Sequence, residues 1–363
     1  MIRILYLPLE FEGWRRARSW TYSAQLGLEV GMRANGAGLR TVTTPWLPRL
    51  RELCGDRRFD QVWVEVVHQD VLDEDTLGWI AERAPVRIGF VPESLTYDDD
   101  AYARWPSLRT RKADVERRLA FMTHAILCDE TDAEGINAAG KLPAFWWPTP
   151  VPRHAIVDEV GTPPPGAAVF AGALYGQRQA LLEHEALTGR IAVRPSPDGP
   201  LYPRVFDRLH AAARAWITRR LPGPRVAAAV YLFVLRRLRR RLYRRWLSSL
   251  RQGSAVVNLP HAVGAYPGRV IEAMAAGRPV VSWTVPHRPR NTALFEHGRE
   301  ILLFAGHEAA AIAEPLGRLA REPGLGRSIA EHAWRKARRF HTTEHRVHQV
   351  FAWIEGGDEP VFG

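Results

Sequence analysis

The chain of 363 residues has little cysteine and no long apolar run. Its two cysteines, Cys54 and Cys128, stand among apolar neighbours without the spacing of metal ligands. We therefore expect neither a disulfide framework nor a zinc site, and a reducing cytoplasm as the compartment. The longest apolar run, residues 226–235, has about half the length that a bilayer span requires. The first residues lack the basic segment and the apolar segment that an export signal contains, so we do not expect the protein to be exported.

The composition favours a soluble globular protein. Hydrophobic residues make up 46% of the chain and charged residues 25%, which excludes disordered and membrane-spanning classes. The length allows two domains of ordinary size. Lys and Arg number 50 against 39 Asp and Glu, a net charge of +11. This excess suits nucleotide diphosphates, anionic lipid headgroups or nucleic acid, without choosing among them, and a GC-rich genome produces the same bias.

Strand and helix patterns alternate along the first half of the chain. The sequence predicts strands at 2–9, 41–44, 61–67, 86–92 and 125–128, and helices at 23–34, 74–83, 109–120 and 132–139. Such alternation gives parallel strands joined by right-handed crossovers, hence a doubly wound sheet. Ligands of these sheets sit outside the carboxyl ends of the strands, where we expect Trp20, His68 and Glu93. His68 also fits a capped strand-end histidine, and Trp20 ordinary packing.

Proline-rich stretches divide the chain near its middle. Residues 145–152 predict an extended crossing and residues 162–166 a stiff linker. We place a first domain at 1–150, a linker at 151–166, a second domain at 167–340, and a C-terminal helix and tail at 341–363. In the second half we expect strands at 167–170, 255–258 and 300–304, with helices at 268–276, 307–320, 326–339 and 343–354.

Residues 203–252 read as two long helices, and the second is strongly basic. It carries seven arginines beside an apolar stripe formed by Leu235, Leu238, Leu242 and Trp246, which predicts an amphipathic helix. One interpretation is peripheral attachment of residues 226–250 to an anionic membrane. The other is packing on the second domain with a solvated arginine face. A nucleic-acid-binding role finds little support, because aromatic residues are sparse among the arginines.

The most informative stretch runs from Gly268 to Trp283. Its first half predicts a helix that opens at Gly268 and ends at Gly277, a residue free to adopt positive φ, and a strand follows. Three apolar residues share one face of this helix, while Glu272 points away from that face. The spacing alone also fits an ordinary helix and strand with a solvated glutamate.

The sequence after Glu272 reads Ala-Met-Ala-Ala-Gly-Arg-Pro-Val-Val, and residues 294–301 read Leu-Phe-Glu-His-Gly-Arg-Glu-Ile. Together they resemble the donor-binding half of GT-B glycosyltransferases of the group 1 type, closest to the spore-maturation (CgeB-like) branch. The resemblance is good over 254–345, adequate over 169–182 and weak before that. It implies two Rossmann-like doubly wound domains that face a cleft, with a last helix at 345–353 that crosses back to the first domain.

The resemblance also implies roles for individual residues. In the family, the glutamate equivalent to Glu272 hydrogen-bonds the ribose hydroxyls of a nucleotide-sugar. The family turn Phe-x-Gly-x-x-Tyr-x-x-Arg matches 170–178, which assigns Arg178 to the donor diphosphate, at a helix start where small residues admit phosphate. A plain surface arginine is the alternative for Arg178. The expected donor-binding set is completed by Gly172, Tyr266, Gly268 and Arg269.

The expected activity is hexosyltransferase-like transfer from a nucleotide-sugar, with retention of configuration and without metal or other cofactor. The candidate catalytic residues are Arg178, Arg269 and His68, and the acceptor-side candidates are Trp20 and Glu93. The run Asp98-Asp99-Asp100 matches a metal-binding Asp-x-Asp pattern, but it follows a strand of the first half and suits a helix N-terminus.

One departure from the family concerns its second glutamate. The wider pattern has a glutamate eight residues before Glu272, and Gly264 stands there. The residue that contacts the sugar is therefore missing. An inactive GT-B-like binding or scaffold protein is the alternative that this departure favours.

Overall fold

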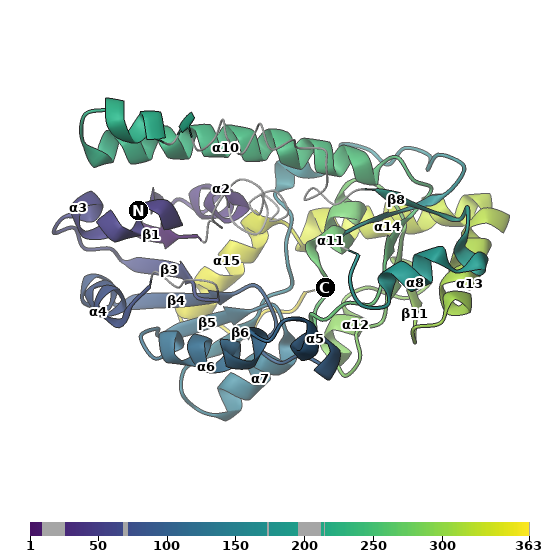
Figure 1. Cartoon of the computed structure of the whole chain (residues 1–363), viewed down its shortest axis with the longest axis horizontal. Helices are drawn as coiled ribbons and strands as arrows, with labels where there is room; N and C mark the ends of the chain where they lie inside the picture. Colours follow the sequence, from purple (N-terminus) through teal and green to yellow (C-terminus); the bar gives the residue numbers. More distant parts are fainter. Residues whose placement is uncertain (9–25, 68–71, 173, 195–211, 214, 363) are drawn as a thin grey trace.

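The computed structural model describes residues 1–8, 26–67, 72–172, 174–194, 212–213 and 215–362. Within these residues the strands form two parallel sheets, one ordered β2-β1-β3-β4-β5-β6 and the other β11-β10-β9-β7-β8. The sheets belong to two α/β domains that lie side by side (Figure 1). This confirms the predicted pair of doubly wound domains.

The first sheet is built from residues 3–146. Its strands are β1 (Arg3–Leu7), β2 (Gly38–Thr41), β3 (Gln61–Glu65), β4 (Val86–Val91), β5 (His124–Leu127) and β6 (Ala144–Trp146). Its helices are α2 (Leu26–Ala34), α3 (Leu50–Cys54), α4 (Glu74–Arg83), α5 (Asp99–Arg104), α6 (Leu108–Leu119) and α7 (Glu130–Ala138). The central strand β3 is buried along its whole length, as expected for a parallel strand with helices on both faces of its sheet.

Two details of the first sheet differ from the sequence prediction. The strand predicted at 41–44 is wrong, because β2 ends at Thr41 and the 3-10 helix η1 (Thr44–Arg49) follows. Pro45 and Pro48 lie in that segment and cannot donate to a sheet ladder. The second difference is β6, which pairs with β5 inside the stretch that was predicted to be only a crossing.

The second sheet is built from residues 168–304. Its strands are β7 (Ala168–Ala171), β8 (Ile191–Arg194), β9 (Val256–Asn258), β10 (Val280–Trp283) and β11 (Leu302–Phe304). Its helices are α8 (Arg178–Glu183), α10 (Gly223–Leu250), α11 (Gly268–Ala275), α12 (Pro289–Ala293), α13 (Ala309–Arg321) and α14 (Pro323–Phe340). As predicted, Gly277 has φ 69° and turns the chain from α11 into β10. The edge strand β8 was not predicted.

The last helix, α15 (Thr343–Ile354), crosses back onto the first domain as predicted. It packs against α2, and Phe351 meets Trp63 of β3 edge to face at 6.2 Å between ring centroids. The two crossings between the domains lie together, because Val151 and Thr342 form a parallel bridge. Figure 1 shows α15 beside the strands of the first sheet.

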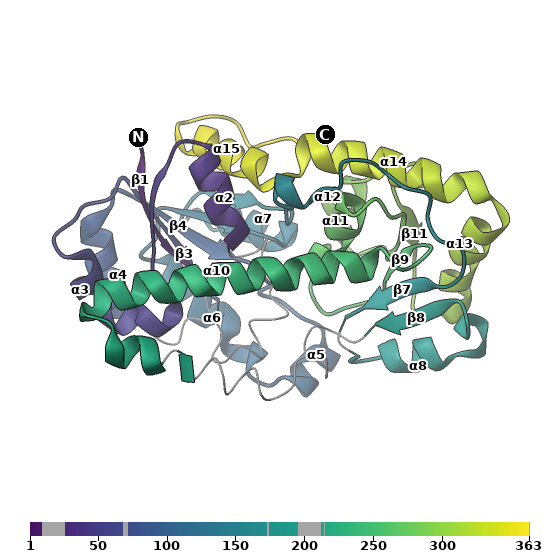
Figure 2. The same cartoon turned by 90° about the horizontal axis from the view of Figure 1, so that it is seen from above.

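The basic helix α10 runs along both domains (Figure 2). At one end Tyr231 contacts Trp46 of the first domain, with ring centroids 6.1 Å apart, and Arg236 bonds Glu29. At the other end Trp246 bonds Glu272 of α11. α10 is the second of the two helices predicted for 203–252, and most of the first falls outside the described residues.

The packing of α10 changes how its apolar stripe is interpreted. Leu235 is only 1% exposed and packs in the protein core, so the predicted stripe is not available as a whole to a membrane. The structure does not describe the side chains of Leu238 and Leu242. Among the described residues, no helix combines the length and apolar character that crossing a membrane requires.

Candidate functional site

Three predicted residues meet at the carboxyl edge of the second sheet, where the loops after β7 and β9 face the first domain. Glu272 lies on α11 and is fully buried. Its Oε2 accepts a hydrogen bond from the indole nitrogen of Trp246 at 2.7 Å. The solvated glutamate considered from spacing alone is therefore wrong. The side chain is held by a helix that also touches the first domain.

Arg178 is the first residue of α8 and is only 1% exposed. Its Nε donates to the carbonyl of Pro260 at 2.7 Å, which ties the loop after β7 to the loop after β9. Its guanidinium lies over the ring of Tyr175, 4.1 Å from the centroid. Burial lowers the pKa of Arg178. The surface arginine considered as an alternative is wrong.

Arg269 approaches the same place from the first turn of α11. A Cβ added at Gly172 would lie 2.5 Å from its Nη1, so the glycine leaves room for this arginine. Burial, and then the nearby Arg178, lower the pKa of Arg269 to about 10. Its Nη1 is buried and has no hydrogen-bond partner in the described part of the chain. Two guanidinium groups are thus brought together, although like charges repel.

Two further polar groups of the loop between β9 and α11 lack a partner among the described residues, the Nε2 of His261 and the hydroxyl of Tyr266. Burial raises the pKa of Tyr266, so its hydroxyl stays protonated. Gly268 begins α11, and a Cβ there would make only ordinary contact with Glu272. His261 was not singled out from the sequence. The available signal was its place three residues after the end of β9, at the ligand edge of the sheet.

The arrangement has the chemistry of an anion site. Burial disfavours both guanidinium charges, and the nearby Glu272 carboxylate offsets only part of this effect for Arg269. An anionic ligand beside the two guanidinium groups would offset more of it. Arginine donors suit the oxygens of a diphosphate, while a buried carboxylate such as Glu272 accepts from hydroxyl groups. We call His261, Tyr266 and Arg269 the unpartnered cluster, because each has a buried polar atom without a partner among the described residues. Of the three, His261 and Arg269 lie close enough to Arg178 for its charge to lower their pKa values.

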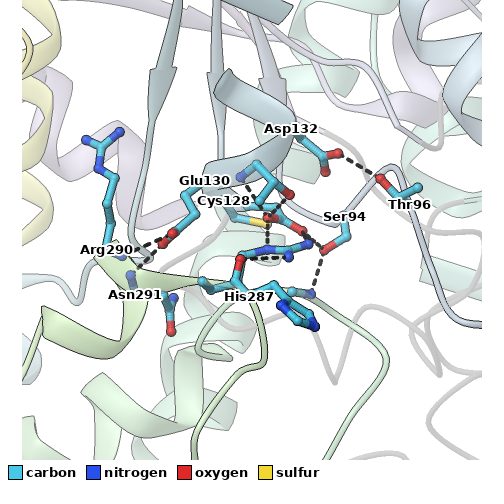
Figure 3. A network of polar contacts seen from close by, with 12 residues as sticks. Ser94, Thr96, Cys128, Glu130, Asp132, His287, Arg290 and Asn291 are labelled. Carbon is cyan, nitrogen blue, oxygen red and sulfur yellow. Dashed lines mark hydrogen bonds and ion pairs between the residues drawn. The ribbon is translucent and has the colours of Figure 1, made fainter. Parts of the chain in front are cut away.

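A second polar group joins the two domains (Figure 3). Asp129, at the N-terminal end of α7, is fully buried and accepts from Nε and Nη2 of Arg288 at 2.5 and 3.0 Å. It also accepts from the hydroxyl of Ser94 at 2.7 Å, and that hydroxyl accepts from the backbone N–H of Gly264 at 2.7 Å. A Cβ at Gly264 would collide with Asp129 and Arg288. This ion pair occupies the space into which a side chain at position 264 would extend.

Glu130 and Asp132 complete what we call the carboxylate cluster (Asp129, Glu130, Asp132). Glu130 accepts from the backbone N–H groups of Arg290 and Asn291, at 3.0 and 2.5 Å, in the first turn of α12. Asp132 accepts from the N–H of Leu95 at 2.7 Å. The cluster thus connects α7 to loops of both domains.

The remaining predicted residues have other surroundings. Glu93 pairs with Arg111 and bonds the hydroxyl of Tyr97, all within the first domain. Asp98 caps α5 by accepting from the N–H of Ala101 at 2.7 Å, which confirms the predicted helix N-terminus. His68 and Trp20 lie outside the described residues.

The structure also bears on metal and cysteine chemistry. The described residues bring together no group of three or more His, Cys, Asp or Glu side chains that would hold a metal ion. Cys54 and Cys128 are both buried and unbridged.

Known proteins resemble this chain both in sequence and in structure. Residues 205–352 match the model of a family described as "Glycosyl transferase-like". HepE of Anabaena, solved with UDP-glucose, is similar in structure with a TM-score of 0.58 at 12% identity, over 98% of this chain and 100% of that chain. An alpha-glucosyltransferase, solved with UDP-glucose and DNA containing an abasic site, gives a TM-score of 0.59 at 13% identity, over 98% and 99% of the two chains.

Sucrose-phosphate synthase from Thermosynechococcus elongatus gives a TM-score of 0.56 at 11% identity, over 99% of this chain and 100% of that chain. No curated protein sequence matches the chain. The two-domain fold is therefore that of GT-B glycosyltransferases, and residues 205–352 are similar to a glycosyltransferase-like family. The CgeB-like branch stays a prediction.

Proposed function

We propose that the protein is a glycosyltransferase that moves a sugar from a nucleotide-sugar to an acceptor. The observation that carries the proposal is the meeting of Arg178, Arg269 and buried Glu272 at the carboxyl edge of the second sheet. Such edges are where open parallel sheets bind ligands. The UDP-sugar complexes of the structurally similar proteins support a nucleotide-sugar as the donor.

In the proposed mechanism Glu272, held by Trp246, accepts hydrogen bonds from the ribose hydroxyls. Arg178 and Arg269 neutralise the diphosphate and stabilise the charge that develops on it as the sugar leaves, an electrostatic effect of pre-placed groups. We propose independence from divalent metal, because these arginines supply the charge that a metal ion would otherwise supply. We propose retention of configuration on the family resemblance alone. Trp20, His68 and Glu93 stay acceptor-side or catalytic predictions.

A thermal-shift screen against UDP-glucose, UDP-N-acetylglucosamine, GDP-mannose and dTDP-glucose tests the proposal first. A ligand at one hundred times its dissociation constant stabilises the protein by about 2.7 kcal/mol, a readily measured shift. Turnover of the bound nucleotide-sugar, even slow hydrolysis, separates an enzyme from the scaffold alternative that Gly264 raised. If none of the four compounds binds, the proposal fails.

The Glu272→Ala variant tests the site itself. Loss of a charged hydrogen-bond acceptor costs about 1.5 to 3 kcal/mol of binding free energy, so calorimetry should show roughly ten- to hundredfold weaker binding. Glu322→Ala is the control, because Glu322 lies in the same domain, outside the motifs that resemble the donor-binding half, with its side chain 51% exposed. Equal affinity in both variants, with the fold intact, would remove Glu272 from the site.

Metal independence has its own test. Transfer measured in EDTA should equal transfer in magnesium or manganese. Loss of activity in EDTA that either metal restores would contradict it, especially if Asp98→Asn and Asp100→Asn behaved like metal-free enzyme.

We also propose that α10 attaches the protein to an anionic membrane surface. The apolar residues Phe233 and Val226 on its outer face are 56% and 45% exposed. Arg237 lies over the ring of Phe233 at 4.9 Å, and Arg240, Arg241 and Arg244 are also exposed. Arginines beside exposed apolar side chains suit the boundary between headgroups and acyl chains.

Liposome co-sedimentation tests the attachment. Vesicles with anionic lipid should retain the protein at low salt, and neutral vesicles should not. Phe233→Ser should weaken retention, whereas Leu174→Ser, at an apolar side chain 45% exposed on the second domain, should not. No retention on anionic vesicles would overturn this part of the proposal.

A further inference from the structure

His261 lies close enough to Arg178 and Arg269 for their charges to lower its pKa. The residue before it, Pro260, accepts the hydrogen bond from Arg178. Its ring meets Trp283 of β10 edge to face, with centroids 5.5 Å apart. Its Nε2 is enclosed and has no partner in the described part of the chain. The ring is therefore fixed in position while one of its nitrogens stays available.

The other nitrogen of His261 fixes the tautomer. A hydrogen bond with the backbone of Val263 raises the pKa of His261. Because Nε2 has no partner among the described residues, we infer that Nδ1 donates this bond to the Val263 carbonyl. In the neutral ring, the proton then sits on Nδ1 and Nε2 carries a lone pair. A lone pair and a phosphate oxygen are both acceptors, so Nε2 needs a proton before it can bond a phosphate.

The charges around the ring decide when that proton binds. Burial, then Arg178 from α8 and Arg269 from α11, hold the pKa of His261 well below its ordinary value. Among the described residues, these two arginines are the charged groups that act on the ring. A bound diphosphate brings negative charge to the same place and reverses the sign of the local field, which favours the imidazolium.

We propose that His261 takes up one proton from solvent when the diphosphate of a nucleotide-sugar binds beside Arg178 and Arg269, and that its Nε2 then donates to a phosphate oxygen. This rests on the proposed function. When the bond between the sugar carbon and the phosphate oxygen breaks, the electron pair stays on that oxygen, and the imidazolium adds a third positive charge near it. Donor binding is thereby coupled to proton uptake.

The coupling fixes the pH dependence of affinity. The proton binds more tightly in the complex than in the free protein, so low pH favours binding. Affinity then falls by about tenfold for each pH unit between the pKa of free His261 and that of the complex. A neutral histidine that merely packs against Trp283 gives no such slope.

Calorimetry on the full chain measures the proton directly, with the nucleotide-sugar that stabilises the protein most among the four screened. Its diphosphate is esterified at both ends and titrates no proton near neutral pH, unlike a terminal phosphate. Titrations at pH 6 and 7 in MES and in bis-Tris, which differ in ionisation enthalpy, give the number of protons bound. We expect uptake approaching one proton at one of these pH values, and none for His261→Gln, whose amide donates without titrating.

The outcomes separate the two proposals. If no nucleotide-sugar binds, the proposed function fails and the inference fails with it. If wild-type protein binds without proton uptake, and with the same affinity at pH 6 and 7, the inference fails while the proposed function stands. The wild-type measurement decides the matter even if His261→Gln does not fold.

Discussion

The two polar clusters of the molecule differ in how completely their groups are paired. In the carboxylate cluster, Asp129, Glu130 and Asp132 accept from N–H groups, hydroxyls or a guanidinium. In the unpartnered cluster, atoms of His261, Tyr266 and Arg269 are buried without a partner in the described part of the chain. Buried polar groups in native proteins are normally satisfied. The first cluster holds the two domains together, and in the proposed function the second binds a ligand.

The carboxylate cluster also explains the missing glutamate. Position 264 lies against the Asp129–Arg288 pair, where a Cβ would collide. A longer side chain at this position requires that pair to open. Gly264 is thus part of the contact between the domains, and its presence alone does not argue for an inactive protein.

The largest expected effect comes from breaking the paired cluster. Asp129→Ala leaves the Arg288 guanidinium, whose side chain is only 14% exposed, without its carboxylate. Removal of one partner from a buried pair costs about 3 to 5 kcal/mol, so urea denaturation should show a loss of this size. Asp114→Ala, which removes an exposed ion pair with Arg117 on α6, is the control and should cost less than about 1 kcal/mol. Similar losses of unfolding free energy in the two variants would contradict the view that the carboxylate cluster holds the domains together.

The next effect is a pH dependence at Asp132. Burial, and then the charge of Asp129, raise the pKa of Asp132 to about 6. A carboxyl group whose folded pKa is raised contributes stability below its unfolded pKa, near 4, and that contribution is lost as pH rises to about 6. The loss amounts to roughly 3 kcal/mol, at about 1.4 kcal/mol per unit of pKa.

Asp132→Asn, which does not ionise, should therefore unfold with a flatter pH profile than the wild type between pH 4 and 7. The measurement is the free energy of unfolding of both proteins at several pH values. Parallel profiles would show that Asp132 does not titrate in this range.

Much of the fold can be predicted from local sequence patterns. The elements that the sequence does not predict are those that depend on tertiary contacts. The alternation of apolar strands and helices predicts both sheets, and the glycine that ends α11 is visible in the sequence. The short edge strand β8 is only half-buried, so it lacks an apolar signature. Strand β6 is hard to predict because it has three residues and prolines stand close on both sides, at Pro143 and Pro148.

The candidate site, like the fold, can be predicted from the sequence only in part. Glu272 and Arg178 stand in recognisable patterns, so their place at the carboxyl edge of the second sheet is predictable. The bond between Trp246 and Glu272 depends on how α10 docks, and the Asp129–Arg288 pair joins residues 159 positions apart. Periodicity carries no information on either contact.

A sharper test compares two arginines at opposite ends of α11. Arg269→Met removes a buried cation with an unpartnered Nη1, so the free energy of unfolding should change little, because the cost of burying the charge and its attraction to Glu272 oppose each other. Arg278 instead bonds the carbonyls of Arg251 and Gly277, and Arg278→Met should destabilise the protein. Nucleotide-sugar affinity should fall roughly ten- to hundredfold in Arg269→Met alone, the loss of one charge-assisted hydrogen bond. If Arg269→Met lost stability but kept its affinity, and Arg278→Met lost affinity but kept its stability, the unpartnered cluster would not be the ligand site.

The smallest expected effect concerns Trp246, a positioning residue that acts on the nucleotide through Glu272. Its indole N–H holds one carboxylate oxygen at 2.7 Å, and Phe at this position keeps most of the ring packing while it removes the donor. A carboxylate that rotates more freely loses part of its pre-arranged geometry, worth about 1 kcal/mol, or about fivefold in affinity. Trp334→Phe is the matched control, because Trp334 donates a similar bond of 2.8 Å to the carbonyl of Val157. Both variants should lose stability, but only Trp246→Phe should weaken nucleotide-sugar binding in calorimetry. Equal affinities would mean that α10 supports the fold of the second domain without orienting Glu272.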